Sequence, residues 1–312
     1  GLASSKTNAA FIARRVARKL RNGDHPYGEL ETEETIGNIS RELCMNYYNS
    51  YYKPNVSYLV MVGDITPEEA KQYAEKYFGD WEQGEVPRHE YDFPEREKGT
   101  RIALVNKEDA VQSYISVTYP VDLSVGEEDA IKASVMNNIL GGGVFSGYLM
   151  KNLREDKGYT YGARSSLSKD PEVGSFTASA EVGTEVTDSA VNEFLYEMNR
   201  IRSEKVEEDH LEMVQNVMSG QFARSLENAR TVARFALNTE RYELPSDYYA
   251  NYLKKVEHVT VGDVQEVAGK YILPHESIIL VVGDKEKVAD KLKRFSDQGE
   301  VEMYSSYGEP VK

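Results

Sequence analysis

The chain has 312 residues, of which 40% are hydrophobic and 29% charged, a balance that excludes a disordered or fibrous protein. The formal net charge of −15 argues against nonspecific nucleic-acid binding, which needs Lys and Arg to neutralise phosphates. The longest apolar runs, Tyr58–Val62 and Ile278–Val282, are far shorter than the roughly 20 residues that span a bilayer. The single cysteine, Cys44, excludes an internal disulfide and a Cys-rich metal site.

The start of the chain gives no sign of targeting. No positively charged segment precedes an apolar run there, so no signal peptide is expected and no compartment is indicated. The chain begins with Gly1 instead of methionine, which predicts that the natural N-terminus lies further upstream.

An internal repeat relates the start of the chain to its end. Residues 39–64 align without gaps with residues 259–284, an offset of 220 positions. Each copy is expected to hold a helix, begun by Ser40 or Thr260, and then a buried strand that ends in Val-Gly-Asp. In the first copy the next helix begins with a capping box at Thr66. The identical pairs are Tyr51/Tyr271, Pro54/Pro274, Ser57/Ser277, Val62/Val282, Gly63/Gly283 and Asp64/Asp284, and the same offset pairs Asn8/Asn228, Ala9/Ala229, Ala13/Ala233 and Arg14/Arg234.

The repeat predicts two domains, of which the first is incomplete. Residues 1–81 would form the C-terminal part of the first domain and residues 100–300 the complete second domain. Residues 82–99, which are charged and contain two prolines, are expected to be the linker. Residue 1 corresponds to residue 221 of the second copy, so about 120 residues of the first copy are expected to lie outside this chain.

The second copy alternates short strands with amphipathic helices, which predicts an α+β fold with a mixed, mostly antiparallel sheet packed by helices. A strand at 159–166 would place Tyr159 and Tyr161 on one face. The predicted strands are 101–106, 113–119, 159–166, 175–182 and 277–283. The predicted helices are 127–140, 146–154, 185–203, 206–226, 228–239, 247–257, 260–270 and 286–295.

No metal site or nucleophilic triad is visible in the sequence. None of the five histidines lies three or four residues from another, so neither H-E-x-x-H nor H-x-x-E-H occurs. The glycines Gly141, Gly142 and Gly143 form neither a phosphate loop nor a nucleophile elbow. They either stop a helix in a mobile turn or let the backbone of a ligand approach closely.

The stretch Asn138–Ser165 combines a helix, these glycines, a short helix ending in Leu-Arg-Glu, and a segment entering a strand. It resembles the second-domain signature of the pitrilysin/insulinase-type zinc metallopeptidases, the group of mitochondrial processing peptidase and insulin-degrading enzyme. Arg154 and Tyr161 match an Arg and a Tyr that stand seven residues apart in that signature. The duplication also resembles the tandem α+β domains of that family.

The resemblance implies that the zinc site and the substrate-binding residues lie in different domains. In the family, an H-x-x-E-H zinc motif lies on the first domain, and the Arg and Tyr of the second domain bind the peptide near the scissile bond. By the offset, the zinc motif falls outside this chain, so zinc belongs to the complete protein or to a partner subunit. We therefore expect no metal ligand here, catalytic roles for Arg154 and Tyr161, and substrate contacts from the glycine run and Tyr159. Peptides and a zinc-binding first domain are the implied partners.

Other interpretations remain open. Arg154 has forked donors suited to carbonyl groups, and the Tyr161 hydroxyl can donate to an oxyanion. The same residues can instead be structural, with Arg154 paired to an acid and Tyr161 packed in the core. The parent is then either a zinc endopeptidase acting on peptides or unfolded proteins, or a non-catalytic structural or partner-stimulating relative. The chain alone is expected to be inactive.

Overall fold

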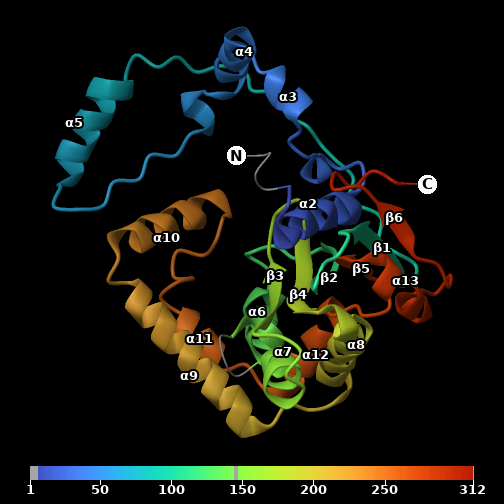
Figure 1. Cartoon of the computed structure of the whole chain (residues 1–312). Coiled ribbons are helices and arrows are strands. Elements are labelled where there is room, and N and C mark those ends of the chain that lie inside the picture. Colours follow the sequence, from blue (N-terminus) through green and yellow to red (C-terminus); the bar gives the residue numbers. More distant parts are fainter. Residues whose placement is uncertain (1–5, 144–146, 312) are drawn as a thin grey trace. The chain divides into compact units, whose positions relative to one another are not determined.

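The computed structural model describes residues 6–143 and 147–311 (Figure 1). The chain forms two compact units: Gly1–Leu30, Asp92–Met218 and Lys254–Lys312 make the first, and Glu31–Tyr91 and Ser219–Leu253 make the second. No helix in the described part is both long and apolar enough to cross a bilayer.

A six-stranded sheet organises the first unit, with strand order β3-β4-β2-β5-β1-β6. The pairs β3–β4, β4–β2 and β2–β5 are antiparallel, whereas β5–β1 and β1–β6 are parallel. The prediction of an α+β fold with a mixed, mostly antiparallel sheet is therefore confirmed. The strands are β1 Arg101–Asn106, β2 Gln112–Val121, β3 Ala163–Ser168, β4 Gly174–Gly183, β5 Ile278–Gly283 and β6 Glu302–Tyr304.

Helices cover both faces of this sheet (Figure 1). Helix α2, Ala9–Asn22, packs on β2 and β5 with Ile12 and Val16 fully or almost fully buried against Leu280. The other face carries a layer of mutually packed helices. Every residue of β5 is buried, because this strand lies between β1 and β2 in the sheet and α2 packs on it. The helices of the layer are α6 Asp129–Asn137, α8 Thr187–Ser203 and α12 Val261–Tyr271.

Most predicted helices are present, with shifted ends. The predicted helix 127–140 ends as α6 at Asn137 and continues as the π-helical turn η3, Asn138–Gly142. The predicted helix 146–154 is split into α7, Tyr148–Met150, and the π-helical turn η4, Lys151–Asp156; its expected start at Ser146 lies outside the described residues. The remaining helices are α9 Glu208–Ser225, α10 Ala229–Arg241, α11 Tyr252–Glu257 and α13 Lys285–Leu292.

The repeat is visible in the helix boundaries. Helix α4 spans Arg41–Tyr51 and α12 spans Val261–Tyr271, so both ends lie 220 residues apart. Ser40 caps α4 and Thr260 caps α12, each through a side-chain oxygen that accepts a backbone N–H. Asn8 and Asn228 cap α2 and α10 at the same offset. These matches are what the duplication predicts.

The second unit differs sharply from the first in burial. Residues 31–91 contain no buried residue, and α4 is exposed along almost its whole length. The helices of this segment are α3 Glu33–Gly37, α4 and α5 Pro67–Phe78, and Thr66 forms the expected capping box of α5. The domain boundaries predicted from the repeat, with a first domain over residues 1–81, a linker over 82–99 and a second domain over 100–300, stay a prediction.

The prediction of a buried strand at 58–62 is wrong for this chain. These residues have no strand structure, and Tyr58 and Leu59 are more than half exposed. Their counterpart β5 is a strand because β1 and β2 supply backbone hydrogen-bond partners on its two sides. No strand lies beside residues 58–62 in the described part of the chain.

Asp263 caps the first turn of α12 and ties this helix to α6. Its carboxylate accepts bonds from the Thr260 N–H and hydroxyl and lies 2.9 Å from Lys132 Nζ. The Thr260 hydroxyl, together with Lys132, lowers the pKa of Asp263 to about 2. Because this is below the ordinary value of 3.8, the stabilisation is complete above that pH and is lost as the pH falls towards 2.

We therefore expect Asp263→Asn to be less stable than the wild type at neutral pH. Thermal unfolding of both proteins between pH 2 and 7 should show the difference shrinking as the pH falls from about 4 to about 2. A difference that does not change with pH would contradict this assignment.

Candidate functional site

Arg154 lies on a tight, well-anchored turn. In η4, the Lys157 amide donates to the Asn152 carbonyl over 3.0 Å, a π-type bond, and the next bond runs from the Tyr159 amide to Leu153 over 2.8 Å. Gly158 ends the turn with φ +66°, a conformation that favours glycine. Leu153 is fully buried while Arg154 is exposed, because neighbouring helical residues point in directions about 100° apart. Short π-helical turns are frequent at functional sites.

Tyr161 lies in a loop, and the expectation that it shares a strand face with Tyr159 is wrong. Strand β3 begins only at Ala163, where pairing with Ala180 of β4 starts. The reason is local: the Thr160 hydroxyl accepts the Gly162 amide and donates to the Gly162 carbonyl, which holds the chain in a turn. Tyr159 is half-buried, and Tyr161 is 95% exposed.

Neither predicted catalytic side chain is engaged in the described part of the chain. Arg154 forms no ion pair and no hydrogen bond there, and Tyr161 makes no ring contact or hydrogen bond. The structural alternative required an acid beside Arg154 and a core around Tyr161. Both groups instead face solvent, where they are accessible to a ligand.

The glycine run is packed against its own chain. A Cβ on Gly141 would lie 2.7 Å from the Ser165 amide nitrogen of β3, and one on Gly142 would lie 2.5 Å from Asn137 Nδ2. Asn137 and Ser165 are joined by a 2.8 Å hydrogen bond between their side chains. The close approach that requires glycine at position 141 is therefore one between η3 and β3. Gly143 ends the turn in an extended conformation.

A polar network lies beneath the Arg154 turn, and no pattern in the sequence predicted it. Asn152 binds Glu193 and Glu197 of α8, and Glu197 also accepts from Arg200 over 3.3 Å. The Arg200 guanidinium lies 4.3 Å from the centre of the Tyr148 ring. Two glutamates four residues apart in one helix repel each other, and this spacing was the available signal that a donor lies between them.

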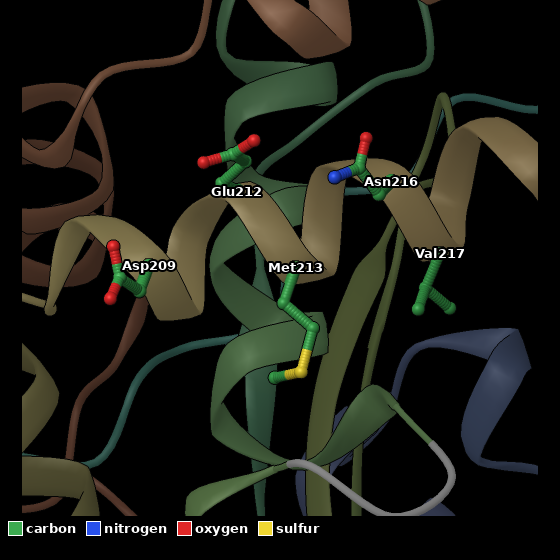
Figure 2. A pocket seen from close by; sticks show the side chains of 5 residues that line it. All are labelled: Asp209, Glu212, Met213, Asn216 and Val217. Atoms are coloured by element: carbon green, nitrogen blue, oxygen red, sulfur yellow. The ribbon is translucent and has the colours of Figure 1, made fainter.

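Helix α9 carries a shallow hollow that is separate from these residues. Figure 2 shows that all of its lining side chains come from one helix, with Met213 and Val217 pointing one way and Glu212 and Asn216 the other. None of the predicted site residues lines it. Side chains that diverge from a single helix do not enclose a ligand, so this hollow is not a candidate binding site.

The described residues do not fit a zinc ion. In the ranges 6–143 and 147–311, no group of three or more His, Cys, Asp and Glu side chains could hold a metal. The positions outside these ranges contain none of these residue types. His89 lies 3.0 Å from the Tyr51 hydroxyl and His258 2.7 Å from the Lys254 carbonyl, so both rings bind ordinary protein groups.

The chain matches a known protein family and several solved structures. The family described as the peptidase M16 inactive domain matches residues 38–218, more than half of the chain. The chain belongs to this family. A crystal structure of an M16 inactive domain from Pseudomonas fluorescens superposes with a TM-score of 0.83 at 19% identity, covering 90% of this chain and 67% of that one.

Two curated relatives are both from Bacillus subtilis. The uncharacterised zinc protease YmxG is 27% identical over 216 residues, which cover 68% of this chain and 51% of YmxG. YmfF, described as a probable inactive metalloprotease, is 21% identical over 79% of this chain and 56% of its own length. The chain thus spans about half the length of the curated relatives it matches. The resemblance to zinc metallopeptidases is confirmed at the level of the family.

Proposed function

We propose that this M16 chain is the substrate-binding part of a zinc endopeptidase that acts on peptides or unfolded proteins. The zinc motif would lie in a first domain of the same parent chain or of a partner subunit. Arg154 and Tyr161 would bind the peptide near the scissile bond, and the glycine run and Tyr159 would line the same site. The observation that carries the proposal is that Arg154 and Tyr161 are both exposed and unengaged beside an ordered turn.

The chemistry of the two groups supports these roles. The Arg154 guanidinium presents several donors in a fixed plane, which suits the carbonyl groups of an extended peptide. The Tyr161 hydroxyl can donate to the oxyanion that develops when water attacks a peptide carbonyl. Zinc, when bound by the other domain, would activate that water. This chain would contribute the orientation of the peptide and one oxyanion donor.

A second candidate function is that of a non-catalytic relative. The similarity to YmfF, described as a probable inactive metalloprotease, favours it. Such a chain would use the same fold to support or stimulate a catalytic partner, and Arg154 and Tyr161 would be dispensable. Substitution of these residues in an assembled enzyme therefore separates the two candidates.

The isolated chain should hold no stoichiometric zinc and should cleave no peptide. The reason is the lack of a paired ligand set in its sequence and in its described structure. Metal analysis after dialysis and a cleavage assay on an unstructured peptide test both points. A one-to-one zinc content that disappears when a histidine is replaced would contradict the proposal.

The exposed surface of α4 and residues 58–62 supports a zinc-bearing partner. In the second copy, the counterparts α12 and β5 are buried by α6, α8, β1 and β2. A first domain that supplied the equivalent elements would bury α4 in the same way. The position 220 residues after Cys44 is Val264, which is fully buried, whereas Cys44 is exposed.

Cys44, the single cysteine, is therefore a probe of partner binding. Its thiol should react rapidly with a maleimide in the isolated chain and much more slowly once the H-x-x-E-H segment from the same source organism is added. The reaction is followed by mass spectrometry of the intact protein. Protection of Cys44 that instead grows with the concentration of this chain alone would mean that a second copy covers the surface.

A further inference from the structure

One buried side chain, Asn152, joins the Arg154 turn to helix α8. Asn152 is only 7% exposed. Its Nδ2 donates to Glu193 Oε2 over 2.9 Å and to Glu197 Oε1 over 2.7 Å. The two acceptors lie on successive turns of α8, so both N–H groups of one amide are used to hold one helix.

The backbone of the same residue closes the turn. The Asn152 carbonyl accepts the Lys157 amide over 3.0 Å, so the loop of chain from 152 to 157 starts and ends at this residue. Arg154 lies inside that loop. A change in the position of Asn152 must therefore move the backbone from which the Arg154 side chain projects.

The charges around Asn152 disfavour an acidic side chain at this position. Glu193 and Glu197 repel each other, and each has a cationic partner: Lys157 at 3.8 Å and Arg200 at 3.3 Å respectively. Burial raises the pKa of Glu197, and the bonds from Asn152 and Arg200 oppose this rise. An amide satisfies both carboxylates without adding charge, whereas an aspartate would add a third negative group.

We propose that Asn152 is a positioning residue, which holds the turn so that Arg154 presents its guanidinium to the peptide. Catalytic and binding groups need their supporting residues to keep them within a fraction of an ångström of the productive geometry. The inference rests on the proposed function, because it takes Arg154 as a substrate contact.

The first test measures the turn itself and needs no activity. In the isolated chain, Asn152→Ala should speed hydrogen exchange at the Lys157 and Tyr159 amides by tenfold or more. A tenfold increase corresponds to a fall of about 1.4 kcal/mol in the free energy of opening the turn. Asn199→Ala is the matched control, because Asn199 lies on α8 two residues after Glu197, and its side chain donates to the Leu195 carbonyl of its own helix and not to the Arg154 turn. If Asn152→Ala does not fold, Asn152→Ser keeps one donor and should show a smaller increase. Unchanged exchange in the folded variants would overturn the inference.

The second test is a double-mutant cycle in the enzyme assembled with its zinc-bearing segment. Asn152→Ala should lower kcat/KM for a peptide, and it should add little further loss in an Arg154→Ala background, because both changes remove the same contact. Additive losses, or normal kcat/KM for Asn152→Ala, would overturn the positioning role. If exchange rises as expected but Arg154→Ala leaves turnover unchanged, the proposed function fails instead.

Discussion

Tyr161→Phe should lower the turnover number of the assembled enzyme by about 10²–10³. The change removes one hydroxyl, and Tyr161 is 95% exposed, so the ring contributes little packing that a phenylalanine would alter. If the hydroxyl donates to the oxyanion, its loss acts on the transition state more than on the bound peptide. We therefore expect kcat to fall with KM almost unchanged.

Arg154→Ala should instead raise KM and lower kcat together, because contacts to peptide carbonyls form before the reaction as well as during it. Steady-state kinetics on an unstructured peptide distinguishes the two patterns. Tyr196→Phe is a suitable control, since Tyr196 is exposed at 52% on α8. Wild-type kinetics for both Arg154→Ala and Tyr161→Phe, in folded protein, would assign the pair to structure and favour the non-catalytic candidate.

Gly141→Ala should destabilise the chain by about 1–3 kcal/mol. The added Cβ would lie 2.7 Å from the Ser165 amide nitrogen and 2.8 Å from Leu149 Cδ1, both closer than van der Waals contact allows. The Ser165 nitrogen belongs to β3, which cannot move without disturbing its pairing with β4. Relief therefore requires η3 and α7 to shift away from the sheet.

Urea unfolding followed by circular dichroism measures this cost. Gly269→Ala is the matched control, because nothing lies within 4 Å of a Cβ there and the residue is inside helix α12. Alanine in a helix interior is favoured over glycine by about 1 kcal/mol, so this variant should be as stable as the wild type or more so. A stable Gly141→Ala variant that no longer bound peptide would show that the glycine serves the ligand.

The sequence predicted the elements whose patterns depend on local chemistry. The alternation in 175–182 matched β4, and the capping residues Ser40, Thr66 and Thr260 begin the helices that they were expected to begin. The short strand β6 was missed, because three residues carry too little periodicity to be recognised.

Elements that depend on distant partners were predicted less well. Residues 58–62 have the composition of β5, yet a strand forms only where neighbouring strands supply hydrogen bonds. The π-helical turn η4 and its anchor Asn152 depend on two glutamates about 40 residues away in the sequence. The roles of Arg154 and Tyr161 were predicted from a family resemblance. The loop around Tyr161 was not predicted, because the residues have a strand-like pattern and the turn depends on a hydrogen bond of Thr160.

Peptide cleavage by the reconstituted protein tests the central claim most directly. This chain, the H-x-x-E-H segment from the same source organism, and their equimolar mixture would be assayed on one unstructured peptide over a zinc titration. The account predicts that neither part cleaves alone, that the mixture cleaves only with zinc, and that Tyr161→Phe in this chain abolishes most of that activity. Equal cleavage by the zinc segment with and without this chain, or an active mixture indifferent to Arg154 and Tyr161, would contradict it.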